Sequence, residues 1–189
     1  MQLLGQSGVE LHLPEGAVIR GGGSPDDYDD VVDPRITKRP ERSDKVFVAA
    51  IGCTNVAITG HGVIDGQGVR FYDAHTNEWG KFNKPSHPRT RMIEFVKCRG
   101  VRFEDVTFKD SPGWTCWLRM CEDVTAERVK IHGDQMMINN DGFHVDGCRR
   151  TVIRGCDLRT GDGLVRQTKT DTRLFAQTSS ATPCGDREK

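Results

Sequence analysis

Two aspartates, Asp141 and Asp162, are the residues of this chain whose type and spacing best suit acid–base chemistry. They lie 162 − 141 = 21 residues apart, within the stretches 139–142 and 160–163. This spacing is about one period of a repeat that runs through the chain, and residues one period apart in a coiled fold stack at roughly 4.8 Å. Two carboxylates that share a cleft are what hydrolysis of a glycosidic bond requires, one as acid and one as base.

The composition is typical of a turn-rich protein with short strands. The 189 residues are 35% hydrophobic and include 21 glycines, which fits one domain without a large helical core. The formal net charge is zero, so we expect no nucleic-acid partner. No apolar run has the length of a membrane span, so we expect no membrane partner either. The first residues do not have the pattern of a signal peptide.

An internal repeat extends from residue 45 onward. Its rows carry apolar residues at nearly every one of the offsets 3, 5, 8 and 10, and they begin at four cysteines: Cys53, Cys98, Cys121 and Cys148. Each period is expected to hold two short strands separated by a polar bend. Such a unit must stack on its copies to bury its apolar face, so the sequence predicts a right-handed parallel β-helix, incomplete at its C-terminal end. The four cysteines are expected to be buried packing residues.

Three segments fall outside this pattern. Residues 70–91 are predicted to form an insertion loop that walls a cleft. Residues 21–30 are rich in aspartate but lack the spacing of a calcium loop, so we expect a solvated loop and no metal site. The β-helix is expected over residues 1–163, followed by a tail, residues 164–189, that has no coil pattern and is a candidate for disorder.

Five short segments occur in a characteristic order: LPEGA at 13–17, GHGVIDGQG at 60–68, SPGW at 111–114, NNDG at 139–142 and TGD at 160–162. In combination they resemble glycoside hydrolase family 28, the polygalacturonase family of pectin-degrading enzymes, over about residues 5–163. The resemblance implies a β-helix that hydrolyses α-1,4-galacturonosidic bonds in pectin with inversion and needs no cofactor. It also implies a polysaccharide partner, a monomer, and a secreted or periplasmic location.

The resemblance assigns roles to the two aspartates. Asp162 resembles the general acid that protonates the leaving oxygen, and Asp141 resembles one of two carboxylates that activate water. The second of these carboxylates would fall at residue 163, where this chain has glycine. The later Gly-His-Gly and Arg-Ile-Lys motifs of the family are absent. His61 is not a substitute for them, because it lies before the catalytic coil, and we expect it to be structural.

Three further residues are candidate substrate contacts: Asn139, Trp114 and His144. Asn139 shares strand parity with Asp141, which favours an orienting role. Strict alternation places His144 on the face opposite Asp141 unless the strand bulges. Trp114 is more typical of a packing residue, although aromatic residues also line sugar sites.

Three functions stay open at this point. The first is a polygalacturonase-type hydrolase, and the second is a catalytically impaired β-helix that binds polysaccharide or is inactive. The third is a β-helix like that of pectate lyases, which we rank last because no calcium cluster is evident beside Asp141. The glycine at 163 and the tail without a pattern also lead to the hypothesis that the chain is a fragment or frame-shifted product of a longer enzyme.

Overall fold

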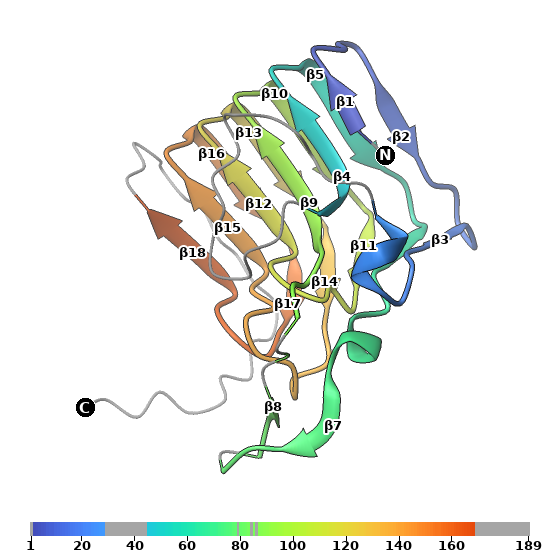
Figure 1. The fold of residues 1–189 in the computed structure, drawn as a ribbon. Coiled ribbons are helices and arrows are strands. Elements are labelled where there is room, and N and C mark those ends of the chain that lie inside the picture. The colour runs from blue at the N-terminus through green and yellow to red at the C-terminus, as the bar shows by residue number, and fades with distance from the viewer. Residues whose placement is uncertain (1, 29–44, 79, 84, 86, 169–189) are drawn as a thin grey trace.

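The computed structural model describes residues 2–28, 45–78, 80–83, 85 and 87–168, which form short strands wound into a solenoid (Figure 1). The strands make three parallel sheets that run along the solenoid. Within these sheets each strand pairs in parallel with its counterpart in the next coil, so the backbone hydrogen bonds of one coil are satisfied by its neighbours. The fold is therefore the predicted right-handed parallel β-helix.

The three sheets are visited in turn by every complete coil. Sheet A contains β1 (Gln2–Leu4), β4 (Val46–Ile51), β9 (Arg91–Val96), β12 (Cys116–Arg119), β15 (Phe143–Asp146) and β18 (Val165–Thr168). Sheet B contains β2 (Glu10–His12), β5 (Thr54–Thr59), β10 (Arg99–Glu104), β13 (Glu122–Glu127) and β16 (Arg149–Arg154). Sheet C contains β3 (Val18–Arg20), β6 (Val63–Asp65), β11 (Thr107–Lys109), β14 (Lys130–His132) and β17 (Asp157–Arg159).

A coil therefore has three strands rather than the expected two. The cysteine rows covered only sheets B and C, because the strands of sheet A lie before each cysteine. Strand β18 belongs to sheet A, so the solenoid continues past the expected boundary at residue 163. Residues 169–189, which make up most of the expected tail, lie outside the described residues.

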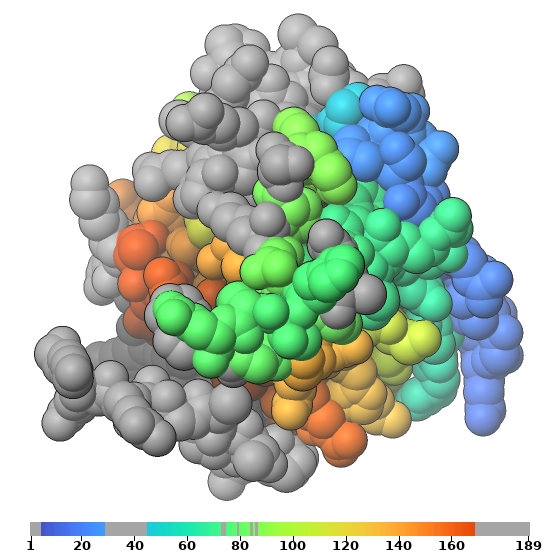
Figure 2. Space-filling model, turned by 60° about the horizontal axis from the view of Figure 1, so that its bottom comes forward, coloured from blue at the N-terminus to red at the C-terminus, as the bar shows by residue number. Residues whose placement is uncertain are grey.

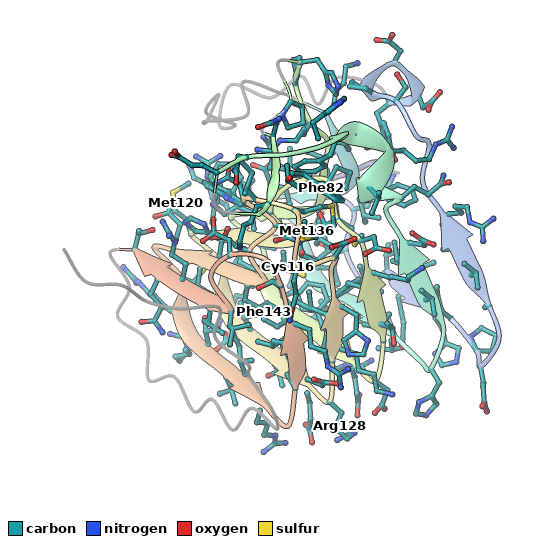
Figure 3. The ribbon with its side chains drawn as sticks, turned by 90° about the horizontal axis from the view of Figure 1, so that it is seen from below. Phe82, Cys116, Met120, Arg128, Met136 and Phe143 are labelled. Carbon is teal, nitrogen blue, oxygen red and sulfur yellow. The ribbon has the colours of Figure 1, made fainter. Side chains whose placement is uncertain are left out.

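The core consists of ladders of inward side chains. The rings of Phe95 and Phe103 lie 5.5 Å apart and those of Phe103 and Phe108 lie 6.0 Å apart, which links the three sheets within one coil. The predicted cysteine ladder is confirmed as a set of buried packing residues: Cys53, Cys98, Cys121 and Cys148. Figure 3 shows Cys116 and Phe143 directed into this interior and Arg128 at the outer rim.

The first row of the repeat is displaced by one residue. Ile64, not Val63, is the register partner of Phe108, and Ile64 is fully buried whereas His61 is exposed. The extra residue is accommodated at Gly60, where a side chain would overlap the Leu13 carbonyl and where φ is 93°. The offsets of 8 and 10 from Cys53 therefore miss the inward positions of this row by one residue, because regular offsets do not allow for this tighter glycine corner.

The corners of the solenoid repeat a left-handed backbone conformation. The corner between sheets A and B has a positive φ in successive coils at Gly5, Gly52, Lys97, Met120 and Gly147. A second ladder at the start of sheet B contains Gly8, Asn55, Gly100, Asp123 and Arg150. Glycine adopts this conformation without strain, whereas a residue with a β-carbon is disfavoured there by about 1–2 kcal/mol.

Connections from sheet C back to sheet A hold the irregular segments. The first contains the short helix η1 (Pro25–Asp27), capped by Ser24, in the segment expected to be a loop; Asp29 and Asp30 lie outside the described residues. The second spans residues 66–90 and contains η2 (Gly68–Phe71) and the hairpin of β7 (Asp73–Thr76) and β8 (Phe82–Asn83), which projects from the solenoid in Figure 1. In the described ranges, no helix combines the length and apolar character required to cross a membrane.

Candidate active site

The predicted site lies at the corner where successive coils pass from sheet C to sheet A. Trp114, Asp141 and Asp162 belong to three consecutive connections at this corner. The connections are joined through their backbones, since Thr115 N donates to Asp141 O at 2.9 Å and Gly142 N donates to Gly163 O at 2.9 Å. The stacking of coils thus brings the two aspartates into neighbouring turns, as their 21-residue spacing predicts.

Asp141 is buried, with 1% of its surface exposed. Its Oδ2 lies 3.4 Å from Nε of Arg166, in strand β18. Arg166 is in turn the register partner of His144. Strand β15 begins only at Phe143, so Asp141 lies before the strand and the alternation of side chains between the two faces does not apply to it. The carboxylate of Asp141 is directed to the Arg166 side chain.

Asp162 is exposed and held by two donors. Its Oδ1 accepts a hydrogen bond from Gly163 N at 2.9 Å, and its Oδ2 accepts one from Asn139 Nδ2 at 3.3 Å. The two carboxylate oxygens offer about four acceptor sites, so the group retains capacity for a ligand. The structure thus brings together the predicted site residues Asn139 and Asp162.

Asn140 connects the Asp141 turn to the Asp162 turn. It is buried, donates from Nδ2 to Asp134 O at 3.1 Å and accepts from Gly161 N at 2.8 Å. A β-carbon on Gly161 would overlap the Met137 carbonyl, so this turn requires glycine at position 161. The buried asparagine therefore fixes the backbone that presents Asp162.

Trp114 and His144 form an aromatic cluster with Trp117. The Trp114 ring lies 4.1 Å from the His144 ring and 5.0 Å from the Trp117 ring, measured between centroids. Trp114 is 8% exposed and His144 is 6% exposed, so both offer little surface to a ligand. His144 also pairs in register with Arg166, which links the cluster to Asp141.

The insertion at residues 66–90 contacts all three connections. Arg89 Nη1 donates to Pro112 O at 3.2 Å and to Ile138 O at 2.9 Å, and its Nη2 donates to Asn139 Oδ1 at 3.2 Å. Lys81 Nζ donates to the Gly161 carbonyl. Figure 2 shows the insertion lying across this face beside the later coils. Phe82 and Met136 are labelled close together in Figure 3, and Phe82 N donates to Met136 O at 2.9 Å.

Sequence reasoning missed Arg89 and Arg166 as site residues. Arg89 lies in an irregular stretch that has no period from which to place it. Arg166 had a usable signal, since it follows His144 by 166 − 144 = 22 residues, again about one coil. Among the residues that the structure describes, no group of three or more His, Cys, Asp or Glu side chains is placed to hold a metal ion.

Comparison with known proteins gives consistent relatives. A polygalacturonase of Gossypium barbadense is 29% identical over 133 residues, which are 70% of this chain and 31% of the relative. An endo-polygalacturonase of Pectobacterium parmentieri is 24% identical over 166 residues, which are 84% of this chain and 41% of the relative. The chain thus spans less than half of the length of these curated relatives.

Solved structures share the fold. The polygalacturonase from Erwinia carotovora ssp. carotovora aligns with a TM-score of 0.71 at 21% identity, covering 94% of this chain and 52% of that structure. A family 28 exopolygalacturonase from Yersinia enterocolitica aligns with a TM-score of 0.73 at 18% identity, covering 92% and 40%. The family model described as glycosyl hydrolases family 28 matches residues 34–173. With most of its length matched by this model, the chain belongs to glycosyl hydrolase family 28.

Proposed function

We propose that the chain is a polygalacturonase-type hydrolase that cleaves α-1,4-galacturonosidic bonds in pectin with inversion. The observation that carries this proposal is the meeting of the Asp141 and Asp162 turns at one corner of a family 28 β-helix. Pectin is a polymer met outside the cell, so we place the protein there, acting as a monomer on the polysaccharide.

The two aspartates would divide the chemistry. Asp162 is exposed and would protonate the leaving oxygen, while Asp141 would hold and activate the attacking water. Inversion requires the two carboxyl groups to leave room for this water between them and the sugar. Asn139 would orient Asp162, and the cluster of Trp114 and His144 would form a wall behind the sugar.

The test is release of reducing ends from polygalacturonic acid. We expect turnover by the wild-type chain, and a loss of about a hundredfold or more in Asp162→Asn, because general acid catalysis contributes about 10²–10⁴-fold. His61→Gln is the matched control, since His61 is exposed and away from the site corner. Proton NMR of the anomer that forms first tests whether the reaction inverts. Unchanged turnover in Asp162→Asn would contradict the role of Asp162 as general acid.

A second candidate function is polysaccharide binding without cleavage. Two observations favour it: residue 163 has no carboxylate, and Arg166 occupies one oxygen of Asp141 where water would have to bind. Retention on immobilised pectin with no release of reducing ends would support binding alone. Release that depends on Asp162 would support the hydrolase.

A further inference from the structure

We propose that Arg89 is a positioning residue that fixes the carboxyl group of Asp162 through the side-chain amide of Asn139. Arg89 comes from the insertion, far in sequence from both partners, and its contact reaches Asp162 in two steps. Arg89 Nη2 donates to Asn139 Oδ1 at 3.2 Å, and Asn139 Nδ2 donates to Asp162 Oδ2 at 3.3 Å. The catalytic part of this proposal rests on the proposed function of Asp162.

The guanidinium determines which way the amide faces. An arginine side chain has only hydrogen-bond donors. It can therefore bond to the oxygen of the Asn139 amide but not to its NH₂ group. With Oδ1 directed to Arg89, the NH₂ group of Asn139 is directed to Asp162, which is the orientation observed. An asparagine without this neighbour would be able to turn its amide over and present an oxygen to the carboxylate.

Arg89 is itself rigidly held. Only 1% of its surface is exposed, and the same guanidinium donates to the carbonyls of Ile138 and Pro112 and to the hydroxyl of Tyr72. Its central carbon also lies 5.4 Å from the centre of the Tyr72 ring. A buried, charge-assisted network of this kind keeps its geometry, because a donor that lost its acceptor would be left buried without a partner.

Asn139 is suited to transmit this constraint. Its backbone has φ 54°, a left-handed conformation that asparagine tolerates better than most residues. The side chain therefore leaves the turn at a fixed angle between Arg89 and Asp162. An exposed aspartate otherwise turns freely about its last side-chain bond, whose torsion is broad. The amide restricts that rotation and so aims the carboxyl group.

The experiment compares Asn139→Gly, Arg89→Lys and the control His61→Gln on polygalacturonic acid. Glycine adopts the left-handed backbone conformation of residue 139 without strain, so Asn139→Gly removes only the side-chain amide. We expect kcat to fall by about tenfold to a hundredfold, because the reacting group is misplaced, and KM to stay within about twofold. Arg89→Lys, which offers no fork of donors, should lower kcat in the same way. His61→Gln changes an exposed side chain away from this network, so it should leave kcat unchanged.

A second readout does not depend on activity. The side-chain NH₂ resonances of Asn139 should move in Asp162→Ala and in Arg89→Lys, and should remain in place in the control His61→Gln. If the wild-type chain releases no reducing ends, the proposed function fails, while these resonances still decide whether Arg89 orients the amide. Wild-type kcat in Asn139→Gly, or resonances that do not respond to Asp162→Ala, would overturn the positioning role.

Discussion

Gly163 lies directly beside Asp141. A β-carbon built on Gly163 would be 3.6 Å from Asp141 Oδ2 and 3.8 Å from Arg166 Nε, which are ordinary van der Waals separations. The neighbouring glycines differ, because side chains at Gly142 and Gly161 would overlap carbonyl oxygens of Leu164 and Met137. The fold thus demands glycine at two positions around the aspartates and accepts a side chain at the third.

Gly163→Asp should therefore raise hydrolysis of polygalacturonic acid. The new carboxylate would lie next to Asp141 and provide a second group to hold the attacking water, and base catalysis of this kind is worth about a hundredfold or more. Gly163→Asn is the control, because it has nearly the same size and lacks a basic oxygen. Initial rates of reducing-end release measure the effect, and equal rates in the two variants would contradict it.

Alanine substitutions at Gly142, Gly161 and Gly163 should change the free energy of unfolding by different amounts. Gly161→Ala and Gly142→Ala should each lower the free energy of unfolding by about 1–3 kcal/mol, the cost of forcing atoms into occupied space. Gly163→Ala should be neutral or stabilising by up to about 1 kcal/mol, because it reduces the freedom of the unfolded chain at a site with room for the methyl group. Urea denaturation of the three variants measures these differences, and a loss at Gly163 equal to that at Gly161 would be inconsistent with the packing.

Met120 offers a stabilising substitution. It occupies a corner of the solenoid with φ 50°, and 41% of its surface is exposed. Met120→Gly should raise the free energy of unfolding by about 1 kcal/mol, since it removes the left-handed strain and loses little packing. Met120→Ala keeps a β-carbon and so controls for the shortened side chain. The denaturation midpoint of the glycine variant should exceed that of the alanine variant.

Stability should fall in acid because two exposed ion pairs between neighbouring coils, Arg128–Asp105 and Arg150–Asp123, are lost when their carboxylates are protonated. Arg128 lowers the pKa of Asp105 and Arg150 lowers that of Asp123, in each case mainly through a side-chain hydrogen bond. A carboxylate with a lowered pKa in the folded state stabilises it above the ordinary pKa of about 3.9, and this stabilisation is lost as the pH falls through the folded value. Thermal denaturation between pH 7 and pH 2 measures it. The loss below pH 4 should be smaller in Arg128→Gln than in the wild type, and parallel curves would refute the linkage.

Much of the fold could be predicted because the inward residues of a β-helix repeat. The offsets from Cys98 and Cys121 correctly placed Phe108 and Ile131 on the interior of sheet C. The row from Cys53 failed after Ile58, since one extra residue at the Gly60 corner shifts the register without interrupting the apolar pattern. The strands of sheet A were not recognised as part of the repeat, because their outward side chains, such as Trp117 and His144, are also buried and give no simple alternation.

Some residues of the candidate site could likewise be predicted from the sequence, and others could not. Asp141 and Asp162 could be predicted, because stacking converts a spacing of one coil into proximity. Arg89 could not, since its place depends on how the irregular insertion folds back onto the Pro112 and Ile138 carbonyls. Site residues that lie within the repeating coils can thus be predicted from the sequence period, whereas those contributed by a non-repeating segment cannot.

The contacts of this insertion alter how the solenoid should come apart. In a repeat protein each unit normally touches only its neighbours, so the ends fray one unit at a time. Here a segment that leaves the solenoid after β6 is bonded to Pro112, Ile138 and Gly161, in the turns that follow β11, β14 and β17. Those turns are consequently tied into a single cooperative unit, and the amide protons on both sides of Asp162 should exchange with solvent together with those of the insertion rather than with those of a fraying end.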